Sequence, residues 1–137
     1  MTKFTYETEI AVRFRDLDPM NQVHNATILV YVEEARRRYF RHVLGVRLEE
    51  TEGALVHQEI DYAAPITLED SVTVAYRFTR IGDSSLTSDF EVRTDDEIAA
   101  EGEVVHVMLD EAGTPRAVPD AWRERIVASE DDRVELE

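Results

Sequence analysis

The feature that most constrains the fold is residues 25–44, which are predicted to form one long helix. Asn25 is the predicted N-cap and Gly45 the residue after the helix end, and basic residues crowd the C-terminal half, as the helix dipole favours. Residues 26–32 are apolar on nearly every side, so this half has to be surrounded by protein. At 1.5 Å per residue the helix would span roughly 30 Å, about the width of a small sheet.

The rest of the chain favours strands. Alternating apolar and polar residues predict strands at 5–15, 54–62, 71–80, 86–94 and 98–110. Gly102 suggests a bulge or a bend in the last strand, and a short helix from Pro119 would carry Trp122 and Ile126 inward. Residues 1–128 are therefore expected to form one domain, and the acidic residues 129–137 a disordered tail.

One antiparallel sheet curling around one helix is the simplest packing of these elements, an α+β fold. The sheet's edges and its second face would need cover, which predicts a homodimer or homotetramer.

Composition excludes several classes of protein. Thirty acidic residues against fifteen basic ones give a formal net charge of −15, which disfavours nucleic-acid binding. There is no cysteine, no apolar stretch of the roughly 20 residues that span a bilayer, and no signal-peptide pattern, so we expect a cytoplasmic protein without membrane partners. Acidic surplus with a single lysine, Lys3, indicates adaptation to a high-salt cytoplasm; an arginine-favouring high-GC genome is the alternative.

The chemically unusual segment is residues 13–26, the loop that enters the helix. It gathers two carboxylates, Asp16 and Asp18, with three amides and His24. Helix N-termini present unpaired N–H groups that could polarise an acyl carbonyl, and a nearby carboxylate could attack it or activate water. From these residues alone, a purely structural role in turns and caps is the stronger interpretation.

Several motifs resemble the 4-hydroxybenzoyl-CoA thioesterase family of hotdog-fold proteins. The resemblance covers roughly residues 5–127. Each motif alone is weak evidence for the family, but the motifs occurring in order with sensible spacing are a strong family signal. The motifs are Asp-Leu-Asp-Pro at 16–19, Val-His-Asn-Ala at 23–26, Tyr-Val-Glu-Glu-Ala-Arg at 31–36, Glu-Ile-Asp-Tyr-Ala-Ala-Pro at 59–65, Arg-Ile-Gly-Asp-Ser-Ser-Leu at 80–86 and Glu-Gly-Glu-Val-Val-His-Val at 101–107.

The resemblance implies a hotdog fold and acyl-CoA hydrolysis. Asp18 would be the catalytic nucleophile or general base, and the backbone N–H of Asn25 would polarise the thioester carbonyl. CoA is then part of the substrate, and no cofactor is implied. Two departures affect substrate choice and rate: Asn21 replaces the family's usual glycine, and His24 replaces an asparagine.

Other residues are weaker candidates for contact with the substrate. His24 could contact it or be a solvated loop residue, and Tyr31 could line the acyl pocket. Glu33 or Glu34 could face the pocket, although salt bridges to the following arginines explain both. Asp16 is expected to be structural.

Later residues could also contribute, each with a plainer alternative. His57 and Glu59 could reach the site across a dimer interface, or be a surface pair. Arg80, Ser84 and Ser85 could touch CoA by the family resemblance, or simply form a charged turn. His106 is expected to be a satisfied core histidine, and no metal-binding or nucleotide-binding motif occurs.

Two other functions stay open. A hotdog enoyl-CoA hydratase or dehydratase would use Asp18, Asn21 and His24, although the spacing and the later motifs fit thioesterases better. A non-catalytic acyl-CoA-binding module would keep the pocket without turnover, against which the intact Asp18 argues.

Overall fold

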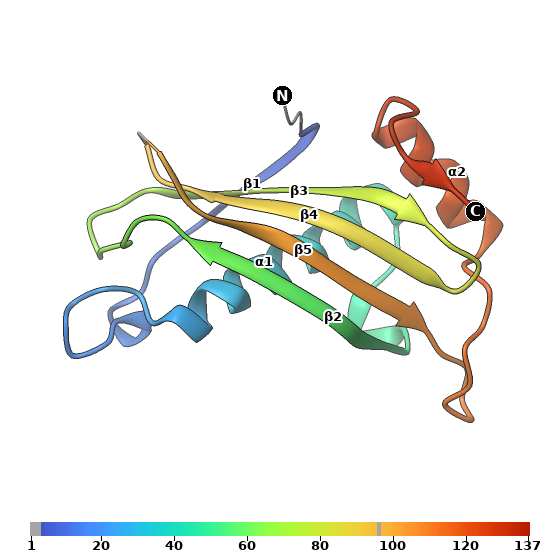
Figure 1. Cartoon of the computed structure of the whole chain (residues 1–137), viewed down its shortest axis with the longest axis horizontal. Helices are drawn as coiled ribbons and strands as arrows, with labels where there is room; N and C mark the ends of the chain where they lie inside the picture. Colours follow the sequence, from blue (N-terminus) through green and yellow to red (C-terminus); the bar gives the residue numbers. More distant parts are fainter. Residues whose placement is uncertain (1–3, 96) are drawn as a thin grey trace.

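The computed structural model describes residues 4–95 and 97–137. Its elements follow the predicted order of strand, helix, four strands and helix (Figure 1). Their bounds are β1 Tyr6–Ile10, η1 Phe14–Asp16, α1 Asn25–Tyr39, η2 Phe40–Leu44, η3 Leu48–Glu50, β2 Gly53–Tyr62, β3 Val72–Ile81, β4 Ser85–Arg93, β5 Ile98–Met108, α2 Asp120–Ser129 and β6 Glu135–Leu136. No helix in these two ranges is long and apolar enough to cross a membrane.

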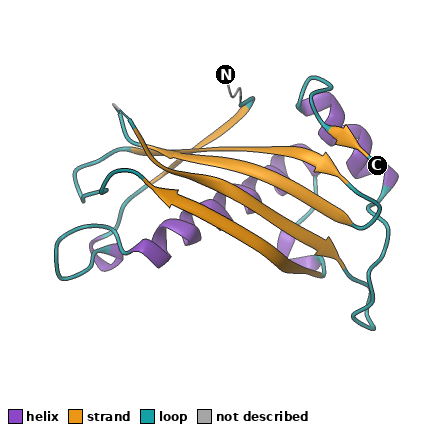
Figure 2. Ribbon diagram, in the orientation of Figure 1, coloured by secondary structure: helices purple, strands orange, loops and turns teal. Residues whose placement is uncertain are grey.

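The five long strands form one sheet in the order β1-β3-β4-β5-β2, with every neighbouring pair antiparallel. The short β6 pairs with β3 in parallel. The curved sheet has α1 lying along one face, and α2 lies at the end of the molecule far from the start of α1 (Figures 1 and 2). One antiparallel sheet around one long helix is the predicted α+β architecture.

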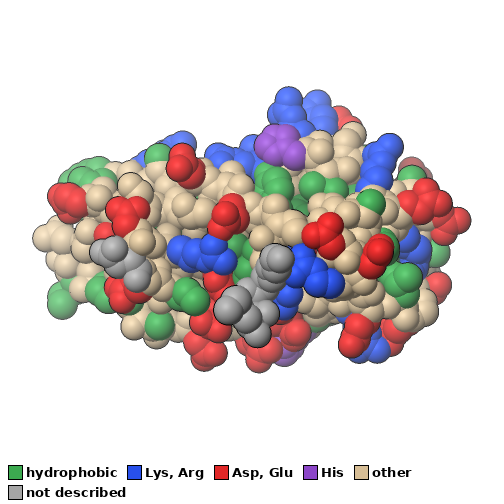
Figure 3. Space-filling model, turned by 90° about the horizontal axis from the view of Figure 1, so that it is seen from above, with side chains coloured by type: hydrophobic (Ala, Val, Ile, Leu, Met, Phe, Trp, Pro, Cys, Tyr) green, Lys and Arg blue, Asp and Glu red, His purple; other side chains and the backbone are tan. Residues whose placement is uncertain are grey.

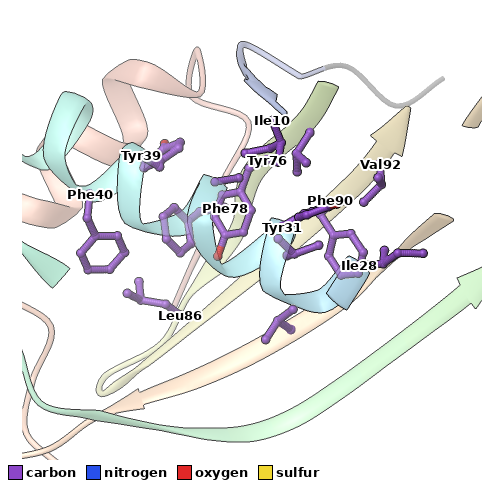
Figure 4. Packing of buried hydrophobic residues seen from close by; sticks show 14 of the residues in the cluster. Ile10, Ile28, Tyr31, Tyr39, Phe40, Tyr76, Phe78, Leu86, Phe90 and Val92 are labelled. Atoms are coloured by element: carbon purple, nitrogen blue, oxygen red, sulfur yellow. The ribbon is translucent and has the colours of Figure 1, made fainter. Parts of the chain in front are cut away.

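The core lies between α1 and the sheet. Tyr39 of α1 stacks edge-on against Tyr76 and Phe78 of β3, with ring centroids 5.9 and 5.0 Å apart (Figure 4). Edge-to-face pairs of this kind stabilise a core by about 0.5–1.5 kcal/mol beyond the area they bury. The predicted all-round cover of the first half of α1 was only partly correct, because Ile28, Tyr31 and Val32 are buried whereas Val30 is 61% exposed.

The helix runs to Leu44, as predicted, but its last turn, η2, is a π-helix. Gly45 ends it with φ 70°, a left-handed conformation that glycine adopts without strain. The predicted N-cap was one residue late: His24 is the N-cap and Asn25 the first helical residue.

The predicted first strand was too long. β1 ends at Ile10, and Phe14, which lies inside the predicted strand, is 79% exposed in η1. The Asp16 carboxylate accepts the Arg13 backbone N–H at 2.9 Å. Such local side-chain bonds compete with strand pairing, and the sequence pattern does not register them.

The predicted bulge at Gly102 is absent from the ladders of β5, where Gly102 pairs in register with both Ile60 and Phe90. A Cβ on Gly102 would lie 2.0 Å from the Glu59 carbonyl oxygen and 2.9 Å from the Phe90 ring. Glycine is therefore needed there for close packing. The register shift in β2 lies instead between Leu55 and His57.

The C-terminal segment expected to be disordered is packed against the sheet. Glu130 is 2% exposed, and its Oε2 accepts the Tyr39 hydroxyl at 2.6 Å and the Phe78 N–H at 3.1 Å. Burial raises the pKa of this carboxyl. The sequence shows a mostly acidic segment here, and the buried partners of Glu130 come from α1 and β3.

The edge strand β2 is the least covered element of the sheet. Leu55, Val56 and Tyr62 are 50%, 58% and 43% exposed, and β2 pairs only with β5. An exposed, partly apolar edge strand is a ready surface for pairing with another chain.

Candidate active site

The loop before α1 folds as a small hairpin whose base is fixed by three backbone contacts. Leu17 and Val23 form an antiparallel bridge, the Asp18 N–H donates to the Gln22 carbonyl at 2.7 Å, and the His24 N–H donates to the Asp16 carbonyl at 2.9 Å. The tip needs one left-handed residue, which is Asn21 with φ 63°. Asparagine tolerates this conformation better than most residues, so it can replace the glycine of the resembling family.

The carboxylate of Asp18 holds this loop with one oxygen only. Its Oδ1 accepts the backbone N–H of Met20 at 2.8 Å and that of Gln22 at 3.1 Å. The other oxygen, Oδ2, has no hydrogen-bond partner among the described residues. The side chain is half-buried. One oxygen thus fixes the orientation of the group, and the other is available to attack a carbonyl or to accept a proton from water.

The helix begins directly after this loop. The Nδ1 of His24 accepts the Ala26 N–H at 3.2 Å, which requires an unprotonated Nδ1. The His24 carbonyl accepts the N–H groups of Thr27 and Ile28. Within the described part of the chain, the Asn25 N–H has no acceptor. It points out of the positive end of α1, where a developing oxyanion would be stabilised.

A hydrogen bond between Asp16 and Tyr31 joins the loop to α1. The Tyr31 hydroxyl donates to the Asp16 Oδ2 at 2.6 Å, and Tyr31 is buried. Burial and this hydrogen bond raise the pKa of Tyr31. The contacts of Asp16 are those of a structural residue, and the Tyr31 hydroxyl is already engaged.

A hollow of about 360 Å³ opens beside the helix start. Gln22, Asn25, Ile28 and Tyr62 line it together with the chain that follows β2. The Tyr62 hydroxyl donates to the Asn25 carbonyl at 3.1 Å, which ties the end of β2 to α1. Tyr62 and Gln22 were not among the predicted site residues, although Tyr62 lies inside one of the quoted motifs and Gln22 directly precedes another.

A second hollow lies farther along α1, between the helix and the inner face of β2. It is lined by Glu33 and Arg36 of α1, Leu55 and Gln58 of β2, and His106 of β5, among others. Glu33 therefore faces a cavity, and it also pairs loosely with Arg36 at 3.6 Å. Its neighbour Glu34 is salt-bridged to Arg37 and Arg38, and the Arg37 hydrogen bond lowers its pKa.

His106 is a core residue, as predicted, at 7% exposure. Its ring, however, has no hydrogen bond to a described residue; the nearest charged atom is Glu33 Oε1, 3.9 Å from Nε2. Burial, and secondly the charge of Arg36, lower the pKa of His106 to about 4, so the ring is neutral at pH 7. The Arg36 Nε is likewise buried without a hydrogen-bond partner. Both residues line the hollow, Arg36 from α1 and His106 from β5, a strand that is paired on both sides.

The remaining candidates are not brought to Asp18 within one chain. His57 and Glu59 alternate with the inward residues Gln58 and Ile60, so they lie on the sheet face away from α1. Arg80, Ser84 and Ser85 lie at the β3–β4 turn, at the end of the sheet opposite the loop before α1 (Figure 1). Arg80 pairs there with Glu137.

Residues 12–126 match the family described as the thioesterase-like superfamily. The chain belongs to this superfamily. A thioesterase from Thermus thermophilus, solved in complex with coenzyme A and Zn, is 43% identical; the match covers 96% of this chain and 98% of that one, with a TM-score of 0.87. This likeness identifies the curved sheet and its central helix as the predicted hotdog fold.

Two further similar proteins have lower sequence identity to this chain. A predicted thioesterase from Bacillus stearothermophilus is 25% identical over 96% of this chain and 98% of that one, with a TM-score of 0.82. The uncharacterized protein YsmA of Bacillus subtilis is 26% identical over 63% of this chain, and the match spans 59% of its own length.

Proposed function

We propose that this thioesterase-superfamily chain hydrolyses an acyl-CoA thioester to a free carboxylic acid and CoA. Asp18 is the nucleophile or general base, and the Asn25 N–H is the oxyanion donor. The observation that carries the proposal is one loop in which a carboxylate with a free oxygen precedes a helix start with an unpaired N–H. The narrower resemblance to 4-hydroxybenzoyl-CoA thioesterases supports the same two roles.

Two routes use these groups. In the nucleophilic route, Asp18 Oδ2 attacks the carbonyl carbon, the CoA thiolate leaves, and water hydrolyses the resulting mixed anhydride. In the general-base route, Asp18 takes a proton from a water molecule that attacks the carbonyl directly. In both routes the negative charge that develops on the carbonyl oxygen is stabilised by the Asn25 N–H and the positive end of α1.

The two hollows beside α1 suit an elongated substrate, and the farther hollow is lined largely by polar and charged side chains. From Asn25 to Glu33 the helix advances about 12 Å at 1.5 Å per residue. A substrate with its carbonyl at Asn25 could therefore extend between α1 and β2 toward Gln58 and His106. The relative solved with coenzyme A supports CoA as the thiol component. A chain of net charge −15 disfavours an acidic acyl-carrier protein as the substrate carrier.

We further propose that the chain works as a homodimer or a homotetramer, built by pairing of exposed β2 edges. Antiparallel pairing about a two-fold axis would place the start of α1 in one copy toward the opposite end of the other copy. Through such pairing, Arg80, Ser84 and Ser85 of one copy could approach CoA bound at Asp18 of its partner. We propose the cytoplasm as the site of action, because the acidic composition suits a high-salt cytoplasm.

Asp110 provides a matched control for Asp18. Its Oδ1 accepts the backbone N–H groups two and four residues ahead, from Ala112 and Thr114, each at 2.9 Å. Asp18 has the same pattern with Met20 and Gln22. Asp18→Asn and Asp110→Asn therefore perturb equivalent turns, and only the first removes the proposed catalytic group.

The test is thiol release from a panel of acyl-CoAs in molar KCl. We expect wild type and Asp110→Asn to release CoA at similar rates, and Asp18→Asn to lose about 10²-fold or more while remaining folded. Equal activity of the two variants would remove Asp18 from the chemical step. Binding of acyl-CoA without turnover by wild type would indicate a binding module, or a hydratase to be assayed with enoyl-CoA.

A further inference from the structure

Three potential metal ligands meet on the sheet face away from α1. His57 and Glu59 are two residues apart on β2, and Glu103 of β5 is the direct partner of Glu59 in the ladder. The His57 Nε2 lies 3.9 Å from Glu59 Oε1 and 3.9 Å from Glu103 Oε2. One nitrogen or oxygen from each side chain lies within 4.8 Å of the others. The imidazole is therefore placed between two carboxylates, too far from either for a hydrogen bond.

The charges around this group are unbalanced. Like charges directly opposite on neighbouring strands destabilise a sheet. On the same face, Asp89 is neutralised by Arg77 at 3.1 Å, and Glu91 by Arg93 at 2.9 Å. Among the described residues, the ion pairs of Glu59 and Glu103 within 4 Å are those with His57, whereas Arg77 and Arg80 lie farther along the same face and line a hollow that includes Glu103. A cation bound between Glu59 and Glu103 would remove this repulsion.

We propose that His57, Glu59 and Glu103 form a binding site for a divalent transition-metal ion of the zinc class. An imidazole in the ligand set favours zinc and its first-row neighbours over calcium or magnesium, which prefer oxygen ligands alone. Ligand atoms about 2.1 Å from a tetrahedral zinc ion lie about 3.4 Å apart. Rotation of three solvent-accessible side chains closes the observed spacing to that value, and water completes the coordination.

This site is independent of the proposed catalysis. It lies on the opposite face of the sheet from α1, and its ligands come from segments too far apart in sequence for a metal-binding motif to reveal. The ladder between β2 and β5 is regular apart from the shift between Leu55 and His57. The backbone positions of the three ligands are therefore fixed before a metal ion binds. A bound ion would link the edge strand β2 to β5 and stabilise the fold, because a ligand that binds only the folded state shifts the unfolding equilibrium.

Asp61 supplies the matched control. It lies two residues beyond Glu59 on the same face of β2 and is directly opposite another carboxylate, Glu101, but it has no histidine beside it. The test uses the EDTA-treated full chain, titrated with ZnCl₂ by calorimetry and with CoCl₂ by visible absorption. The variants are His57→Ala, Glu59→Gln, Glu103→Gln and Asp61→Asn, with folding checked by circular dichroism.

We expect wild type and Asp61→Asn to bind one zinc ion per chain and to show tetrahedral Co²⁺ absorption bands. The other three variants should bind at least tenfold more weakly, and zinc should raise the melting temperature only of proteins that keep the site. Equal weakening in all four variants would indicate diffuse attraction to an acidic surface and overturn the proposal. An absence of stoichiometric binding by wild type would overturn it as well, and neither result bears on thioester hydrolysis.

Discussion

The side chain of His24 accepts the backbone N–H of Ala26 at 3.2 Å and leaves the intervening Asn25 N–H without an acceptor in the described structure. Asn25 is also the first helical residue, a position that proline tolerates well. The backbone of His24, with ψ 138°, is compatible with a following proline. Proline at position 25 can therefore remove the proposed oxyanion donor and retain the helix.

We predict that Asn25→Pro lowers kcat/KM for thioester hydrolysis by about 10²–10³-fold, the usual loss for one oxyanion donor. Asn25→Ala keeps the N–H and should stay within a few-fold of wild type. Steady-state kinetics with both variants checks this, after thermal unfolding has shown that the two variants have similar melting temperatures. Similar activity in the two variants would mean that the donor is elsewhere.

The cap made by His24 predicts a stability effect separate from catalysis. His24→Ala removes the acceptor for the Ala26 N–H and should lower the free energy of unfolding by about 1 kcal/mol. Asparagine and aspartate are strong N-caps, so His24→Asn and His24→Asp should recover that stability. Urea denaturation measures all three, and a fully stable His24→Ala would show that the cap contributes nothing.

His106 predicts a pH dependence of stability. Its pKa is about 4 in the folded chain and about 6.5 when unfolded, so between these values the unfolded state binds more protons. The stabilising contribution is complete above pH 6.5 and is lost as the pH falls toward 4, by at most about 3 kcal/mol. His106→Gln lacks this titration. The free energies of unfolding of wild type and His106→Gln, measured by denaturation from pH 7 to 4, should therefore converge as the pH falls. A constant difference between them would contradict the assignment.

Glu130 predicts a contrast between two substitutions. Glu130→Ala leaves the buried Tyr39 hydroxyl and Phe78 N–H without an acceptor and should destabilise the chain by about 2–4 kcal/mol. Glu130→Gln retains an acceptor oxygen without a buried charge and should stay within about 1 kcal/mol of wild type at pH 7. Thermal unfolding distinguishes the two variants. Equal losses of stability in both would assign the effect to the carboxylate charge of Glu130.

The charge distribution predicts a dependence on salt. Acidic side chains occur over much of the surface seen in Figure 3, with arginines interspersed among them. On the outer face of the sheet, Glu101 lies directly opposite both Asp61 and Glu91. Screening should relieve this repulsion, so the chain should unfold in dilute buffer and refold in molar KCl. Full stability at low salt would favour the codon-usage explanation for its arginine content.

Periodicity was sufficient to predict the elements and their order, because burial imposes a repeat of two on strands and about 3.6 on helices. It failed where local hydrogen bonds replace packing, as in the turn that Asp16 forms with Arg13. It also failed at Gly102, where the reason for glycine is the distance to a backbone oxygen on the next strand and to the Phe90 ring.

The sequence by itself determined the hotdog elements, the loop that carries Asp18, and the helix start at which Asn25 presents its N–H, since all depend on neighbours within a few residues. Only the tertiary structure decided that Tyr31 supports Asp16, that Glu130 is buried under α1, and that His106 opens onto a hollow beside Arg36. The same holds for His57, Glu59 and Glu103, which strand register brings together. These relationships join residues far apart in the chain, and the energies that fix them come from packing and desolvation that no local pattern records.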